Sequence, residues 1–229
     1  MARMATATES RFLFQDRPDA GMQLGERIAV MNLRSPVILA LPRGGVPVGI
    51  EIAKALKAPL DLLMVRKIGV PWQPELALGA VADGTDPHTS INQNVARIAQ
   101  VSESDIAAIA QRQLKEIERR RSMWLRKRAH VPVAGRTVIV VDDGIATGAS
   151  MRVALDAVRA QRPLRTILAA PVVAGEIADA LRQACGDLIC LAAPSDLTSV
   201  GQYYKDFHQL TDAEVKGALD KAWQTLPAH

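Results

Sequence analysis

Short apolar runs alternate with segments of helical spacing along most of the chain. The first run covers residues 37–41, and apolar residues then recur at helical spacing over 46–57 before a second run at 60–65. Runs without polar interruption suit strands that are buried on both faces, as they are in parallel sheets. We therefore predict that strand, helix and strand form a parallel βαβ unit here.

The second half of the chain repeats this order after residue 131. The predicted elements alternate between strand and helix, beginning with a strand, over residues 137–141, 147–160, 164–170, 175–184 and 187–191. Such alternation is typical of an open sheet with helices on both faces. The predicted fold class is α/β, with a doubly wound, mainly parallel sheet flanked by helices.

Two segments flank the predicted core, which spans residues 36–195. An N-terminal helical segment at 1–35 starts irregularly over 1–18 and becomes amphipathic over 21–33. A C-terminal segment at 196–229 ends in a helix, and a Thr-x-x-Glu capping box marks the start of that helix.

A helical insertion interrupts the core at about residues 95–130. One long helix is predicted over 102–128, and two short strands could precede it at 76–82 and 89–92. Residues 111–130 hold eight basic and two acidic residues, although the net charge of the whole chain is only +4. A charge run of this kind is usually a solvated helix face, so we do not expect a nucleic-acid partner.

The composition narrows the class of protein. Hydrophobic residues make up 48% of the chain and aromatic residues only 3%, so the core must be aliphatic. Cys185 and Cys190 are too few for a disulfide framework and lack zinc-site spacing, which indicates reduced thiols and a cytoplasmic protein. No stretch has the pattern of a signal peptide or the length of a membrane span, so we expect neither export nor a membrane partner.

The most informative motif covers residues 138–150, where an aliphatic strand ends in Asp142 and Asp143. Open α/β sheets bind ligands at the carboxyl ends of their strands. Residues 147–150 then open the next helix, and backbone N–H groups and hydroxyls at a helix start can hold a phosphate. Because carboxylates accept hydrogen bonds from a sugar diol, the spacing predicts a pocket for a ribose 5-phosphate.

Two other nucleotide-binding classes share part of this pattern. The magnesium-holding strand of a P-loop NTPase also ends in Asp, but the chain has no Gly-x4-Gly-Lys-Ser/Thr sequence. A dinucleotide-binding domain would need Gly-x-Gly-x-x-Gly after its first strand, and residues 42–47 do not supply it. Packing alone also explains poorly why two adjacent carboxylates precede a phosphate-type loop.

Residues 138–150 resemble the phosphoribosyl pyrophosphate (PRPP) signature of the type I phosphoribosyltransferases. Residues 41–47 are similar to the pyrophosphate-binding loop of that family, and Arg66 and Lys67 sit where related enzymes have a mobile basic loop. Residues 64–81 also resemble a bacterial subgroup of uncharacterised phosphoribosyltransferase-domain proteins. The resemblance extends, in the right order, over the whole predicted core.

The resemblance implies Mg²⁺-dependent transfer of a phosphoribosyl group from PRPP to a nitrogenous base or related acceptor, with release of pyrophosphate. The protein would have to neutralise the leaving diphosphate, position the acceptor and exclude water. The alternative is a non-catalytic PRPP- or nucleotide-binding regulatory module whose basic helix contacts RNA or DNA. The pyrophosphate loop and the basic pair favour the enzyme, because a sensor needs only the phosphate loop. A homodimer could form.

The resemblance also implies residue roles. Lys67, with Arg66 as the second candidate, would stabilise the departing diphosphate. Asp142 and Asp143 would bind the ribose hydroxyls and, indirectly, the metal. The other substrate-binding candidates are Arg43, Gly44 and Gly45 in the pyrophosphate loop, and Ala146, Thr147, Gly148, Ala149 and Ser150 in the phosphate loop.

Two features bear on the acceptor. Hypoxanthine and guanine enzymes have an Asp at the position of Ala146, so a 6-oxopurine acceptor that uses this carboxylate is less expected. A small hood in the C-terminal segment should recognise the acceptor. The aromatic candidates for stacking on it are Tyr203, Tyr204, Phe207 and Trp72. The first three could instead form a packing cluster. Trp72 could be a lid residue that becomes ordered on binding, or it could anchor the hood or a neighbouring subunit.

Overall fold

The structure of the chain is a computed structural model that describes residues 12–84, 87–126 and 128–227. Most of the predicted irregular start at 1–18 lies outside these residues, as does Lys127 of the basic run. Cys185 and Cys190 are both free, as predicted. Among the described residues, no helix combines the length and apolar character that crossing a membrane requires.

Five parallel strands form the central sheet, in the order β2-β1-β6-β7-β8. They are β1 (Pro36–Ala40), β2 (Leu60–Leu62), β6 (Thr137–Val141), β7 (Arg165–Val172) and β8 (Gly186–Ala192). The chain moves outward from β1 to β2 and then returns to the other side of β1 at β6. The carboxyl ends of β1 and β6 therefore meet at the switch point, where sheets of this kind bind ligands. The predicted fold class is confirmed.

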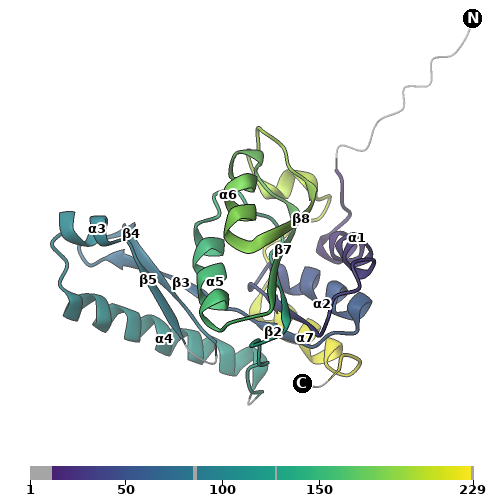
Figure 1. Cartoon of the computed structure of the whole chain (residues 1–229), viewed down its shortest axis with the longest axis horizontal. Helices are drawn as coiled ribbons and strands as arrows, with labels where there is room; N and C mark the ends of the chain where they lie inside the picture. The colour runs from purple at the N-terminus through teal and green to yellow at the C-terminus, as the bar shows by residue number, and fades with distance from the viewer. Residues whose placement is uncertain (1–11, 85–86, 127, 228–229) are drawn as a thin grey trace, which may run out of the picture.

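Helices cover both faces of this sheet (Figure 1). α5 (Ala149–Ala160) and α6 (Gly175–Cys185) lie on one face, and α1 (Arg17–Ala29), α2 (Gly45–Leu56) and α7 (Asp212–Ala222) lie on the other. Side chains of β1 alternate between the two layers, because Val37 and Leu39 pack with α5 and α6, whereas Ile38 and Ala40 pack with α1, α2 and α7. The core is mainly aliphatic, as the composition predicts.

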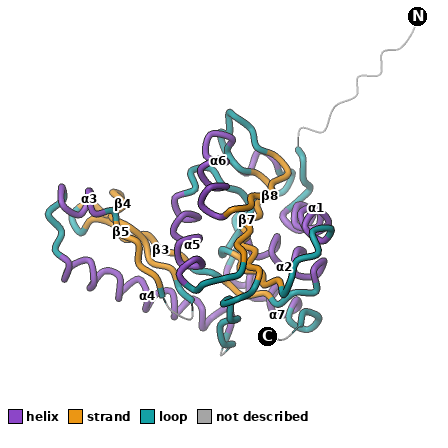
Figure 2. The backbone as a smooth tube through the Cα atoms, viewed as in Figure 1, coloured by secondary structure: helices purple, strands orange, loops and turns teal. Residues whose placement is uncertain are grey.

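The part of the chain between β2 and β6 forms a second, antiparallel sheet, which extends away from the central sheet (Figure 2). It consists of β3 (Val65–Val70), β4 (Gln73–Ala82) and β5 (His88–Ile91), which α3 (Gln93–Ile98) and α4 (Glu103–Leu125) follow. The long helix α4 runs along this sheet, and α5 also packs against the sheet. We call residues 65–125 the arm.

β3 is the largest departure from the predicted elements. The strand predicted over 60–65 ends at Leu62, and β3 contains Arg66 and Lys67, which the resemblance places in a mobile loop. Both residues pair with β4. The register of this pairing shifts at Gly69, where a Cβ would overlap the backbone of β4. This glycine and the irregular register disguise the strand in the sequence.

Two helices also differ from the predictions. α1 begins at Arg17 rather than near residue 21, because the Asp16 side chain accepts a hydrogen bond from the Asp19 backbone N–H and caps the helix. The short helix α3 has no counterpart among the predicted elements, although the Asn92 side chain caps it in the same way.

The C-terminal segment returns to the N-terminal one. After β8, the 3-10 helix η1 (Val200–Tyr203) leads to Tyr204, whose backbone forms a β-bridge with Phe14. The predicted capping box at Thr211 is complete and starts α7. We call residues 196–210 the hood. The domain boundaries given above stay a prediction.

Candidate functional site

The loops that follow β1 and β6 lie side by side at the carboxyl end of the central sheet. The two strands are paired in register up to Ala40 and Val141, so both end at the same level. A Cβ built on Gly44 would overlap the carboxylate of Asp143. A glycine is required at this point, because the loop after β1 rests directly on the carboxylate of the neighbouring loop.

A cavity of about 230 Å³ opens beside these loops. Its walls come from both loops, from the connection between β2 and β3, and from α4. The lining residues are Leu41, Pro42, Arg43, Leu63, Met64, Val65, Arg66, Arg120, Trp124, Asp142 and Ser150. The cavity therefore brings together four of the residues singled out in the sequence: Arg43, Arg66, Asp142 and Ser150. We call it the motif cavity.

The phosphate loop lies at the start of α5. Gly148 has a φ of 71° and caps the helix, which begins at Ala149, two residues later than predicted. Ala146, Thr147, Ala149 and Ser150 are all exposed. Because N–H groups at a helix start attract anions, this exposed turn can accept a phosphate.

The two adjacent carboxylates have different surroundings. Asp142 is half-buried and lines the motif cavity, and its Oδ1 accepts a hydrogen bond of 2.9 Å from the Asp143 backbone N–H. Burial and the charge of Asp143 raise the pKa of Asp142 well above its ordinary value. Asp143 instead forms an ion pair with Arg17 of α1, with 2.7 Å between Arg17 Nε and Asp143 Oδ2. The resemblance gives Asp142 and Asp143 the same role, but in the structure only Asp142 lines the motif cavity, whereas Asp143 is paired with Arg17.

Arg17 and the hood together hold Asp143 in place. The buried guanidinium of Arg17 donates to the His208 carbonyl oxygen and lies 3.9 Å from the centroid of the Phe207 ring. The Tyr204 hydroxyl donates to the Asp143 carbonyl oxygen at 2.6 Å. The N-terminal helix and the hood therefore meet the motif at this one residue.

Packing occupies two of the aromatic candidates for acceptor stacking. Tyr204 is 2% exposed, and its ring centroid lies 5.1 Å from that of Phe14 and 4.9 Å from that of Phe207. For Tyr204, the structure corrects the stacking hypothesis in favour of the packing cluster, whereas Phe207 is only half-buried and its stacking role stays a prediction. Tyr203 is half-buried, and Trp72 is exposed at the turn between β3 and β4, so their proposed roles stay predictions.

Arg66 and Lys67 lie on opposite faces of β3, because successive side chains of a strand alternate. Arg66 lines the motif cavity and donates from Nε to Gln113 Oε1 at 2.6 Å. Lys67 lines a neighbouring cavity of about 500 Å³, and its Nζ lies 3.2 Å from Glu75 Oε2. Arg66 therefore shares a cavity with Asp142, whereas Lys67 shares one with Ala149 and Ser150 of the phosphate loop.

Three residues around the site are absent from the sequence predictions. Arg17 is 126 positions from Asp143, and nothing in the local sequence marks their contact. Arg120 and Trp124 of α4 both line the motif cavity, and their four-residue spacing places them on one helix face. That spacing within the basic run is the signal that could have identified them.

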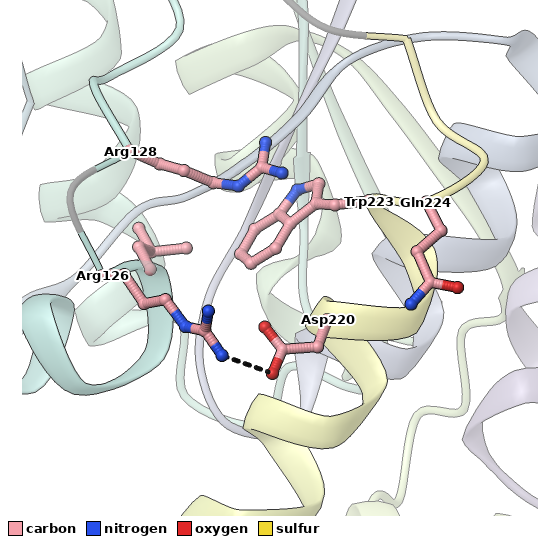
Figure 3. A pocket seen from close by; sticks show the side chains of 6 residues that line it. Arg126, Arg128, Asp220, Trp223 and Gln224 are labelled. Carbon is pink, nitrogen blue, oxygen red and sulfur yellow. Dashed lines mark ion pairs between the residues drawn. The ribbon is translucent and has the colours of Figure 1, made fainter.

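A separate cavity of about 550 Å³ lies where the end of α4 meets α7 (Figure 3). Arg126 forms an ion pair of 3.6 Å with Asp220, and the Arg128 guanidinium lies 4.4 Å from the centroid of the Trp223 ring. These contacts use part of the basic run within the chain, and the expectation that the run does not bind nucleic acid stays a prediction.

Comparisons with known proteins identify relatives of this chain. Residues 20–190 match the family model of the phosphoribosyl transferase domain. The chain is 43% identical, over 210 residues, to proteins of two Mycobacterium tuberculosis strains that are provisionally named as phosphoribosyl transferases. The match covers 92% of this chain and 47% of each relative, so the chain spans about half the length of these curated relatives.

A solved structure shares both the fold and part of the sequence. The crystal structure of the protein TT1426 from Thermus thermophilus superposes with a TM-score of 0.79 at 38% sequence identity. The match covers 93% of this chain and 99% of that one. The family model, these relatives and the paired strand-end loops agree, and the chain belongs to the phosphoribosyl transferase domain family.

Proposed function

We propose that this protein transfers a phosphoribosyl group from PRPP to a nitrogenous base or a related acceptor and releases pyrophosphate. The supporting observation is that Arg43, Asp142 and Ser150 line one cavity. They come from the pyrophosphate loop, the carboxylate pair and the phosphate loop. In that order, they match the diphosphate, the ribose hydroxyls and the 5-phosphate of PRPP.

The proposed reaction breaks the bond from C1 of the ribose to the diphosphate and forms a bond from C1 to the acceptor. Positive charge develops on the ribose, and negative charge develops on the leaving diphosphate. Arg43 and Arg66 would stabilise the diphosphate, and Asp142 would orient the ribose through its hydroxyls. The apolar side chains of Leu41 and Leu63 would limit access of water to C1.

The residues of the motif cavity fit a Mg²⁺ ion that is shared with the substrate. Asp142 offers a carboxylate there, and within the described parts of the chain no group of three or more His, Cys, Asp or Glu side chains could hold a metal alone. Mg²⁺ commonly takes one or two protein carboxylates and completes its coordination with water and substrate phosphates. When bound, the ion would offset part of the negative charge of the diphosphate.

The hood is placed to contribute to acceptor recognition. A Cβ on Gly144 would overlap the Val200 side chain of the hood, so the hood packs directly on the loop after β6. Ala146, in the same loop, is exposed and offers no carboxylate for proton transfer. We therefore propose an acceptor other than a 6-oxopurine that depends on that carboxylate.

A pyrophosphate assay tests the proposed reaction. The protein is incubated with PRPP, Mg²⁺ and a panel of purines, pyrimidines and amines, and calorimetry measures PRPP binding in parallel. We expect release of pyrophosphate with at least one acceptor. Binding of PRPP without release for any acceptor would support the regulatory module instead, and loss of both signals would contradict both functions.

Asp142→Asn tests the assigned ribose site. We expect PRPP affinity to fall by about 100-fold or more, because two hydrogen bonds to a charged acceptor weaken by ~1.5–3 kcal/mol each. Asp179→Asn is the matched control, since Asp179 is an exposed carboxylate of α6 away from the motif cavity. Unchanged affinity in Asp142→Asn would place the ribose elsewhere.

A further inference from the structure

One face of α4 forms a wall of the motif cavity. Gln113, Ile117, Arg120 and Trp124 follow one another at intervals of four, three and four residues, which places them on the same side of the helix. Ile117 and Trp124 are buried, and Gln113 holds the guanidinium of Arg66. Arg120 and Trp124 line the motif cavity from this face. The arm therefore contributes side chains as well as shape to the site.

This wall carries more positive than negative charge. Arg66 is held by the neutral side chain of Gln113, and within the described residues it has no ion pair. Burial and the charge of Arg120 lower the pKa of Arg66. Glu116 is the only acid that pairs with Arg120 among the described residues, at 2.9 Å, and it also pairs with Arg119. Three guanidinium groups, of Arg43, Arg66 and Arg120, therefore line the motif cavity, and Asp142 is the one carboxylate among its lining residues.

Trp124 adds an unused hydrogen-bond donor. Its side chain is 2% exposed, and its indole Nε1–H has no hydrogen-bond partner in the described parts of the chain. Buried polar groups are nearly always paired, so an unpaired donor in the lining of a cavity calls for an explanation. Nε1 is enclosed in this structure, so an acceptor oxygen of a ligand would become its partner only with a shift of the Trp124 ring toward the motif cavity.

We propose that Arg120 and Trp124 of α4, together with Arg66 of β3, bind the diphosphate of PRPP from the arm's wall of the motif cavity. This inference rests on the proposed function and adds residues outside its sequence motifs. A diphosphate has enough charge for several guanidinium groups and enough oxygens to accept from the indole as well. Arg43 and the strand-end loop would hold the same group from the central sheet.

The first test measures the affinity for inorganic diphosphate with Mg²⁺ by calorimetry at fixed ionic strength. Arg120→Gln should bind about tenfold more weakly, because it loses a charged hydrogen-bond donor. Arg119→Gln is the matched control. Arg119 lies on the same helix and pairs with the same Glu116, but it does not line the motif cavity. We expect its affinity to change by less than about twofold.

The second test uses Trp124→Phe, which removes the N–H and keeps an aromatic ring in the core. We expect diphosphate to bind several-fold more weakly, and the melting temperature, which the smaller buried ring should lower, shows whether the variant is still folded at the assay temperature. The change in tryptophan fluorescence when diphosphate binds should also be smaller in Trp124→Phe than in Trp72→Phe, which keeps Trp124. A purely structural Trp124 would leave affinity and fluorescence response unchanged.

The outcomes separate this inference from the proposed function. Wild-type diphosphate affinity in both Arg120→Gln and Trp124→Phe overturns the inference, even if the protein turns over PRPP. A wild-type protein that does not bind diphosphate overturns it too. If both variants bind diphosphate weakly but no acceptor yields pyrophosphate from PRPP, the diphosphate site stands and the proposed reaction does not.

Discussion

The strand-end loops and the arm reach the same cavity by different means. The loops after β1 and β6 offer backbone N–H groups together with the side chains of Arg43, Asp142 and Ser150, and their positions follow from two paired strands. The arm offers long cationic side chains, and partners far apart in the sequence hold them, as Gln113 holds Arg66. A short sequence motif can therefore describe the first wall of the site, whereas long-range contacts set the second.

A buried ion cluster joins the arm to the core. Arg121 is buried, with Nη2 2.8 Å from Asp61 Oδ1 and Nη1 3.2 Å from Asp83 Oδ2. Asp83 also accepts a hydrogen bond from the backbone N–H of Met64, which lines the motif cavity. Because Arg121 adjoins Arg120 in α4, the cluster positions both the helix wall and the connection between β2 and β3.

Removing this anchor should have the largest effect on the arm. We expect Arg121→Met to lower the free energy of unfolding by about 3–5 kcal/mol at pH 8, because two buried carboxylates lose their cation. Urea denaturation followed by circular dichroism measures the loss. Arg119→Met, which breaks an exposed ion pair of the same helix, should leave the free energy of unfolding nearly unchanged. Equal losses in the two variants would mean that packing alone holds the arm.

The loss in Arg121→Met should depend on pH. Burial raises the pKa of Asp83 to about 6 in the wild-type protein. Burial also acts to raise the pKa of Asp61, but His130 and Arg121 outweigh it and hold that pKa below its ordinary value. Without Arg121 both pKa values rise, so the folded variant takes up protons that the unfolded chain does not. Its stability then falls as pH rises, and the loss should be smaller at pH 5 than at pH 8.

The loop after β6 could be predicted from the sequence because its signals are local. The aliphatic strand, the two carboxylates and the helix start all lie within residues 137–150. The same holds for the glycines after β1, since each strand of a parallel sheet ends at the same edge. A single strand-loop-helix unit therefore shows which residues reach that edge.

The direction of each side chain depended on contacts that no local pattern contains. Asp142 and Asp143 are adjacent and chemically identical, and what separates their roles is Arg17, 126 positions from Asp143. The sequence also did not show on which face of β3 the Arg66 side chain lies. The irregular register at Gly69 makes this strand hard to recognise, and the strand decides the face. The sequence could therefore predict where the candidate site lies, but only four of the eleven residues that line its cavity.

Gly44→Ala should disturb the loop after β1, which is one of the two strand-end loops. A Cβ there would overlap the carboxylate of Asp143, so the loop or the ion pair with Arg17 must shift. We expect the free energy of unfolding to fall by about 1–3 kcal/mol, with weaker PRPP binding in calorimetry. The matched control is Gly217→Ala in α7, where a Cβ meets nothing within 4 Å and should stabilise the helix slightly. If Gly44→Ala behaves like this control, the two loops do not touch in solution.

Tyr204→Phe should have the smallest effect and shows how the hood supports the motif. The variant loses the hydrogen bond to the Asp143 carbonyl oxygen and keeps the ring between Phe14 and Phe207. We expect a loss of about 0.5–1.5 kcal/mol in the free energy of unfolding. PRPP affinity should change little in calorimetry, since Asp142 lines the cavity and Asp143 does not.

Tyr203→Phe is the control for this variant, because the Tyr203 hydroxyl makes no hydrogen bond among the described residues. It should leave both stability and PRPP affinity at wild-type values. If Tyr204→Phe instead weakens PRPP binding as strongly as Gly44→Ala does, the hood takes part in binding the substrate. The site would then have three contributing regions, and the contrast between the strand-end loops and the arm would describe only two of them.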